Sequence, residues 1–178
     1  NIKGELEQFR VVEVPVLSQE LSELYPEIKT YLGFSSDNPG VRARFSVTPQ
    51  GLQTMVTYPD GPMNFTVPLS KTDNTSYIVY TREARAEVEK KFDCLVEDEF
   101  LRIDTNNLAN SDADDQILRT FRMAISTNGE YTEFWDDGDN SNGDAQADAL
   151  AQVVSTLNRS NEVFEVDMAV TFTLVTGT

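Results

Sequence analysis

The chain of 178 residues contains no histidine and only one cysteine, Cys94. The first absence leaves no imidazole to serve as a metal ligand or a general base, and the second excludes an internal disulfide bond. Basic residues are scarce, because 14 Lys and Arg residues stand against 30 Asp and Glu residues, a formal net charge of −16. Since nucleic acids and anionic membranes are bound through Lys and Arg, this balance argues against both as partners.

Long apolar runs are missing as well. None approaches the roughly 20 residues that cross a bilayer, so the sequence predicts no membrane span. Residues 1–5 lack the apolar core of a signal peptide, and any export signal is therefore expected to have been removed or never to have been present. Apolar residues nevertheless make up 39% of the chain, which is enough for a packed core.

Residues 119–175 have the pattern of a strand, a helix and a second strand. The first strand has one apolar face, formed by Phe121, Met123 and Ile125, and the second alternates in the same way over residues 166–175. The helix is predicted to begin near Asp144, and its core-facing side is formed by Ala147, Leu150, Val153, Val154, Leu157 and Asn161. Its opposite side is polar and is formed by Asp148, Gln152, Ser155 and Arg159. Such a βαβ unit places its two strands parallel in one sheet.

Two runs in this unit, LRTFRMAISTNGEYTEFW and ADALAQVVSTLNRSNEVFEVDMAVTFTLV, resemble the opening of the catalytic domain in reprolysin-like (adamalysin-like) zinc endopeptidases of the metzincin clan, particularly their secreted bacterial members. The resemblance implies peptide hydrolysis by zinc-bound water, with the zinc held by the histidines of an H-E-x-x-H-x-x-G-x-x-H motif. That motif is absent and is expected downstream of Thr178. The chain as given is therefore predicted not to be an enzyme, but to be the N-terminal part of a metalloendopeptidase precursor.

The region before residue 96 is predicted to consist of short antiparallel strands. Turn residues rich in Pro, Gly, Asn and Asp separate apolar alternations at residues 8–17, 29–34, 41–47, 52–58, 63–69 and 77–80. Ser18 is the predicted N-cap of a short helix that ends before Pro26. The predicted fold class is therefore α+β, a β-rich antiparallel domain followed by the first βαβ unit of a metzincin-type catalytic domain.

This β-rich region also carries a resemblance. The order YPEIKTYLGFSSDNPGVRARFSVTPQGLQTMV, MNFTVPLS and SYIVYTRE is similar to the propeptides of reprolysin-like proteases. It implies a domain that assists folding and maintains latency, with the remainder of its own catalytic domain as partner and a peptide or protein as the substrate of the parent enzyme. The implied division is a propeptide-like domain at residues 1–96, an acidic linker with the processing region at residues 97–116, and the start of the peptidase domain at residues 117–178. The implied location is extracellular or at the cell surface.

Cys94 lies between the β-rich region and the βαβ unit. By the same resemblance, its thiolate would occupy the fourth position of the catalytic zinc and displace the nucleophilic water, which makes Cys94 a candidate zinc ligand in the latent form. The flanking Pro-Arg and Gly of the better-known switch sequences are missing. The other interpretation is a buried small hydrophobic residue. The acidic, turn-rich composition that follows predicts a processing cut between residues 104 and 118.

The acidic residues 136–144 suggest calcium as a second candidate cofactor. They lack EF-hand spacing, and a solvated loop before a helix N-cap is the favoured interpretation. The nearby aromatic residues either belong to the core or line a substrate cleft; they are Tyr131, Phe134 and Trp135. An alternative function of a different class is a non-enzymatic, secreted or cell-surface β-rich module that binds protein or glycan.

Overall fold

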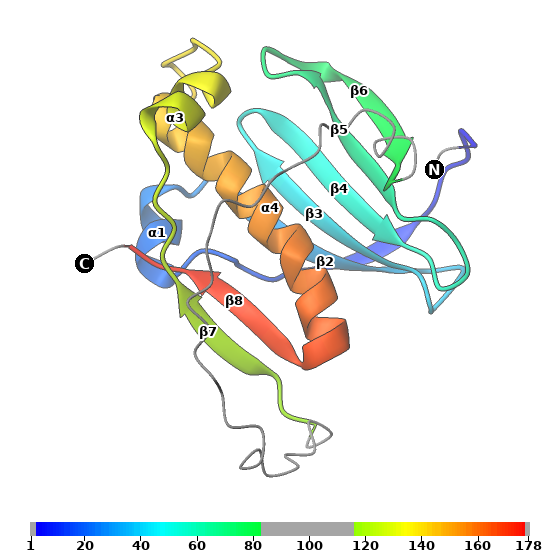
Figure 1. The fold of residues 1–178 in the computed structure, drawn as a ribbon. Helices are drawn as coiled ribbons and strands as arrows, with labels where there is room; N and C mark the ends of the chain where they lie inside the picture. The colour runs from blue at the N-terminus through cyan, green and yellow to red at the C-terminus, as the bar shows by residue number, and fades with distance from the viewer. Residues whose placement is uncertain (1–2, 83–115, 177–178) are drawn as a thin grey trace, which may run out of the picture.

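The computed structural model describes residues 3–82 and 116–176 and arranges them in three layers (Figure 1). A six-stranded antiparallel sheet is the first layer, the long helix α4 (Ala145–Met168) is the second, and a parallel pair of strands is the third. The predicted α+β class is confirmed: the antiparallel sheet comes from the N-terminal part of the chain and the small parallel sheet from the C-terminal part.

The antiparallel sheet is a meander in which each strand pairs with the next one along the chain. Its strands are β1 (Phe9–Glu13), β2 (Lys29–Ser35), β3 (Arg42–Thr48), β4 (Gly51–Thr57), β5 (Asn64–Ser70) and β6 (Asp73–Thr81). Gly51 follows the tight turn after β3 with φ +112°, and a Cβ there would lie 3.1 Å from Pro68 and Tyr77. The predicted strands at residues 29–34, 41–47, 52–58 and 63–69 are confirmed to within one residue at each end, but β6 begins at Asp73, four residues before the strand predicted at residues 77–80.

β1 ends at Glu13, so the prediction of one strand over residues 8–17 was wrong in its second half. Beyond that point Val14 still donates its N–H to the Thr30 carbonyl at 2.9 Å, and the Thr30 side chain makes the next two hydrogen bonds. Its hydroxyl donates to the Val14 carbonyl at 2.7 Å and accepts the Val16 N–H at 3.0 Å. The chain thereby leaves the antiparallel sheet and turns toward the parallel strands.

A short bridge and a short helix follow. Leu17 forms a parallel bridge with Leu174, so this segment borders the second sheet. Ser18 then caps α1 (Gln19–Leu24), because its hydroxyl accepts the Leu21 N–H at 3.4 Å. The predicted N-cap and short helix are confirmed.

The predicted βαβ unit is confirmed in its topology. β7 (Arg119–Met123) and β8 (Val170–Leu174) are parallel neighbours, and α4 lies in the connection between them. The helix begins near Asp144 as predicted, and Asp144 is its N-cap, because its carboxylate accepts the N–H groups of Gln146 and Ala147 at 3.1 and 2.9 Å. Neither α4 nor any other helix in the described ranges is long and apolar enough to cross a membrane.

Two details of this unit differ from the prediction. α4 continues through Met168, so the second strand does not begin near residue 166. The last turns stay helical because Glu165 pairs with the sheet residue Arg44, and Ala169 ends the helix in the left-handed conformation at φ 53°. The helix α3 (Gly129–Trp135) was not predicted.

Segments far apart in the sequence build one core. The N-terminal part contributes the buried residues Val16, Leu17, Leu21 and Ile28. The C-terminal part contributes Ala151, Val153, Val154, Leu157 and Leu174. Burial of one large aliphatic side chain contributes about 1.5–3 kcal/mol, so this core is a main source of attraction between the two parts.

Candidate functional site

The side of α4 that faces the six-stranded sheet is polar although it is buried. The sequence placed Gln152 and Ser155 on the polar side of the helix, and their side chains are almost inaccessible to solvent. α4 contacts β3 and β4 along this side, while its other side contacts β8 (Figure 1). The helix therefore lies between two sheets, which its amphipathic pattern alone did not reveal.

Four charged side chains connect α4 to β3. Arg42 Nε donates to Glu162 Oε1 at 2.8 Å, and Arg44 Nε donates to Glu162 Oε2 at 2.8 Å. Arg44 also pairs with Glu165 through Nη2. The side chains of Arg44 and Glu162 are 0% and 3% exposed, so both charges are removed from water. Two guanidinium groups against two carboxylates leave this charge cluster neutral, which is the condition under which buried ions are tolerated.

A row of glutamine side chains makes the second polar connection. Gln53 Nε2 donates to Gln152 Oε1 at 2.7 Å. Gln152 Nε2 donates to Gln50 Oε1 at 2.5 Å, and Gln50 Nε2 donates to the Trp135 carbonyl at 3.0 Å. Because each amide is at once donor and acceptor, the row joins β4, α4 and the end of α3 in one hydrogen-bonded chain.

Two asparagines of α4 bind backbone groups of the sheets on either side. Asn158 is fully buried and donates to the Phe45 carbonyl at 3.0 Å. Asn161 donates to the Phe172 carbonyl and accepts the Phe172 N–H, both at 2.9 Å. Asn161 thus satisfies the backbone of β8 on the edge away from β7.

The same edge of β8 is completed by the N-terminal part of the chain. The Leu174 N–H donates to the Val16 carbonyl at 2.8 Å, and the Ser18 N–H donates to the Leu174 carbonyl at 2.8 Å. Residues 16–18 therefore act as a short third strand beside β8. The parallel sheet is thus completed by residues 16–18, which are far from β8 in the sequence.

An apolar groove of about 660 Å³ lies beside β7 and α4. Its apolar lining includes Met123, Ile125, Tyr131, Leu157, Phe164 and Phe172. Within the described ranges β7 pairs with β8 alone, and Phe121 on β7 is 52% exposed. Of the aromatic residues left open by the sequence, Tyr131 packs against the core and lines this groove, whereas Phe134 is exposed.

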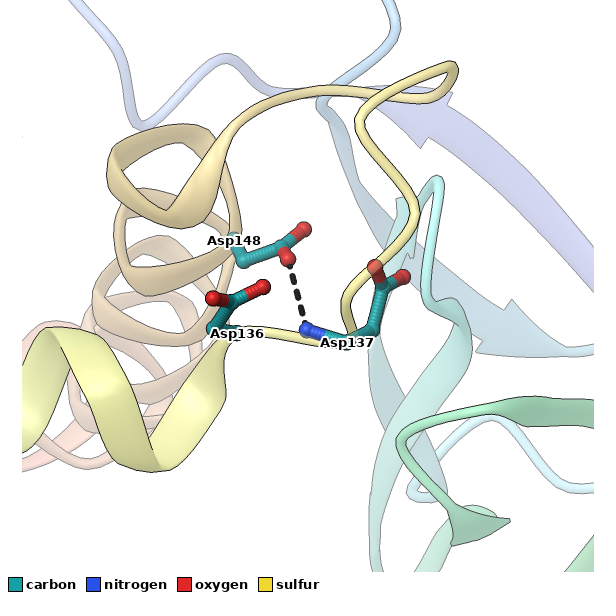
Figure 2. Close-up of side chains that lie close together, drawn as sticks. All are labelled: Asp136, Asp137 and Asp148. Atoms are coloured by element: carbon teal, nitrogen blue, oxygen red, sulfur yellow. Dashed lines mark hydrogen bonds between the residues drawn. The ribbon is translucent and has the colours of Figure 1, made fainter.

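Three carboxylates from the acidic stretch and the start of α4 come together. One carboxylate oxygen from each of Asp136, Asp137 and Asp148 lies within 4.8 Å of the others. Figure 2 shows Asp148 projecting from α4 toward the Asp137 backbone, whose N–H donates to Asp148 Oδ2 at 3.0 Å. Asn142 Nδ2 donates to Asp137 Oδ2 at 3.0 Å. The sequence identified the acidic stretch but gave no sign that Asp148 would join it.

Burial raises the pKa of Asp148, and the nearby charges of Asp137 and Asp136 act in the same direction. A cation would relieve this repulsion, but calcium takes 6–8 oxygen ligands. One oxygen of Asp148 already accepts an N–H, and the Asn142 amide presents nitrogen to Asp137. The described side chains thus offer only part of a calcium shell, and calcium binding stays a prediction.

Asp148→Asn is expected to raise the melting temperature at pH 7 in the presence of a chelator. Because its folded-state pKa lies above the ordinary 3.8, Asp148 contributes stability when protonated, and this contribution is lost as the pH rises through the folded-state pKa. Asparagine keeps the acceptor for the Asp137 N–H without the charge. Thermal denaturation at pH 7 and pH 3 measures the difference, which should shrink at the lower pH.

The exposed Asp60→Asn is the matched control and should leave the melting temperature nearly unchanged at both values of pH. A destabilised Asp148→Asn variant at pH 7 would contradict the assignment of a repulsive carboxylate cluster. Melting temperatures measured with added calcium test calcium binding separately. Binding at the cluster should raise the melting temperature of the original chain and raise that of Asp148→Asn much less.

Cys94, the predicted zinc ligand, lies outside the described residues, and so does most of the predicted processing region at residues 104–118. Within residues 3–82 and 116–176, the acidic cluster is the single group of three carboxylate or thiol ligands close enough to share a metal ion. Zinc binding by this chain therefore stays a prediction from the family resemblance.

Comparisons with known proteins do not assign this chain to a family. No protein-family model matches it, and no curated protein or solved structure matches it either. The relation to metzincin peptidases accordingly stays a prediction carried by the quoted sequence runs.

Proposed function

We propose that this chain is the N-terminal part of a zinc-dependent metalloendopeptidase precursor, in which the β-rich region is a propeptide that assists folding and maintains latency. The observation that carries the proposal is the completion of the β7–α4–β8 unit by the β-rich region. Residues 16–18 border β8, and β3 and β4 cover the polar side of α4. The proposed peptidase domain thus begins with a unit whose core is partly supplied by the proposed propeptide.

Folding assistance follows from what α4 would lack without the sheet. Glu162 would lose both guanidinium partners, and Asn158 would lose its backbone acceptor. Val16 and Leu17 would no longer fill the core beside Leu174. An unsatisfied buried polar group costs about 1–3 kcal/mol, so the βαβ unit gains much of its stability from contact with the sheet.

Latency is assigned to Cys94, whose thiolate would take the open zinc position in the downstream part of the precursor. Zinc supplies an activated water when that position is free. The remainder of the catalytic domain is the proposed partner, and the apolar groove beside β7, whose pairing within residues 3–82 and 116–176 is with β8, is the surface proposed for it. The substrate of the parent enzyme would be a peptide or protein outside the cell.

A second candidate function, a secreted or cell-surface module that binds glycan or protein, is favoured by a different cleft. This cleft of about 400 Å³ lies between the sheet and the helices, and its lining includes Gln50, Lys71, Tyr80, Trp135 and Arg159. Aromatic faces beside amide and basic groups are suited to polar, ring-shaped ligands. Binding of this kind needs neither zinc nor the rest of a peptidase domain.

The two candidates are separated by the intact mass and metal content of the protein purified from its source cells. The precursor proposal predicts a mass well above 19.9 kDa and about one zinc per chain. In that precursor, Cys94→Ser should raise peptidase activity before processing, whereas an exposed serine replacement such as Ser36→Ala should not. A protein of 19.9 kDa without zinc would overturn the precursor proposal and favour the binding module.

A further inference from the structure

We propose that the two parts of the chain stay together as a non-covalent complex after the connection between them is cut. Residues 3–82 are the N-terminal module and residues 116–176 are the C-terminal module. The contacts between them combine a shared apolar core, backbone pairing and buried charges. This combination is typical of permanent interfaces, which resemble a domain core divided between two chains.

Backbone pairing and apolar burial occur at the same place. Leu17 is 4% exposed and Leu174 is 3% exposed, and their strands form a parallel bridge. Residues 16–18 thus add a strand to β8, and strand addition binds through main-chain hydrogen bonds while side chains supply specificity. Loss of this segment would open both the edge of β8 and the core beneath it.

The charge cluster slows the dissociation of the N-terminal module from the C-terminal module. Arg42 and Arg44 belong to the N-terminal module, while Glu162 and Glu165 belong to the C-terminal module. Separation would require each charge to regain water before the apolar faces part. Buried, hydrogen-bonded charge pairs across an interface act mainly on the dissociation rate.

Each module also has a face that, within the described residues, is covered by the other module. The sheet face toward α4 contains Met55, which is paired with Arg44 and is 3% exposed, and α4 contributes the fully buried Val154. Exposed apolar patches of this kind drive association in soluble proteins. Burial of the two faces against each other is therefore favourable whether or not the chain connects the modules.

The consequence for a precursor rests on the proposed function. If residues 3–82 are a propeptide, cleavage near residues 104–118 would not by itself release it. Release would need a further event that opens the charge cluster and withdraws residues 16–18 from β8. Cleavage and loss of the propeptide would then be two separate steps.

The experiment inserts the recognition sequence of a specific protease within residues 104–115 of the full chain and cuts it to completion, as judged by denaturing electrophoresis. Size-exclusion chromatography with light scattering and native mass spectrometry then report the assembly at about 1 µM. The expected result is one species that contains both fragments in equal amounts and keeps the circular dichroism of the uncut chain. Fragments that elute separately would overturn the inference.

A pair of substitutions tests which contacts hold the complex. Arg44→Met should raise the dissociation constant of the cut complex by about 100-fold or more. Lys29→Met, which removes an exposed ion pair with Glu13, should change it by less than about fivefold. Equal changes in the dissociation constant for Arg44→Met and Lys29→Met would overturn the role of the charge cluster. If Arg44→Met does not fold, co-elution of the two fragments of the cut original chain decides whether the modules stay together. Zinc and peptidase activity do not enter this measurement, so it can fail independently of the proposed function.

Discussion

Replacement of Arg44 by alanine is expected to lower the free energy of unfolding by about 3–5 kcal/mol, because it removes one partner of a buried charge pair. The Arg44 side chain is 0% exposed and binds both Glu162 and Glu165. Its loss leaves Glu162 and Glu165 at the sheet–helix interface, and within the described ranges Arg42 is the remaining ion-pair partner of Glu162. Urea denaturation at pH 7, followed by circular dichroism, measures the change as a lower midpoint.

Lys29→Ala is the control for this substitution. Lys29 pairs with Glu13 at 3.3 Å, but their side chains are 38% and 47% exposed. An exposed ion pair contributes between about 0 and 1 kcal/mol, so the midpoint should move little. If Arg44→Ala were as mild as Lys29→Ala, α4 would not be docked on β3 through buried charges.

Leu157→Ala is expected to destabilise the protein by about 2–5 kcal/mol, the range for truncation of a buried leucine. Leu157 lies on the side of α4 that faces β8, is 5% exposed and belongs to the apolar core. The substitution removes methyl and methylene contacts and leaves a cavity between α4 and the parallel strands. Thermal and urea denaturation should both show Leu157→Ala to be less stable than the original chain.

Val163→Ala on the same helix is the matched control. Val163 is 43% exposed, and alanine has the higher helix propensity, so this change should stay within about 0.5 kcal/mol of the original chain. A small effect for Leu157→Ala would show that the parallel strands do not pack on α4. The two substitutions thus separate the contribution of core packing from that of helix formation.

The sequence predicted the fold best where local patterns decide. The turn residues and short alternations predicted the strands of the meander, Ser18 was identified as an N-cap from side-chain chemistry alone, and α4 was predicted to begin near Asp144. The βαβ topology followed from the length and amphipathicity of the helix between two strands. The caps, turns and strand alternations depend on neighbours within a few residues, which a sequence displays directly.

The sequence failed where distant contacts decide. Residues 166–168 alternate like a strand, yet they remain helical because Glu165 is bound by Arg44 of β3, which is distant in the sequence. The polar side of α4 suggested no covering element, and nothing local marked Arg44 as a buried partner. Asp148 likewise joined the acidic cluster through the return of the loop. Cys94 lies outside the described residues, so its role is still a prediction from sequence.

The order of strands in the meander has a consequence for synthesis of the chain. Every strand of the antiparallel sheet pairs with its sequence neighbour, so the sheet needs only short loop closures to form. The bridge between Leu17 and Leu174 and the ion pairs of α4 need closures that span most of the chain. Since a ribosome delivers the N-terminal end first, the sheet can be in place before α4 emerges. The helix would then fold against a preformed surface.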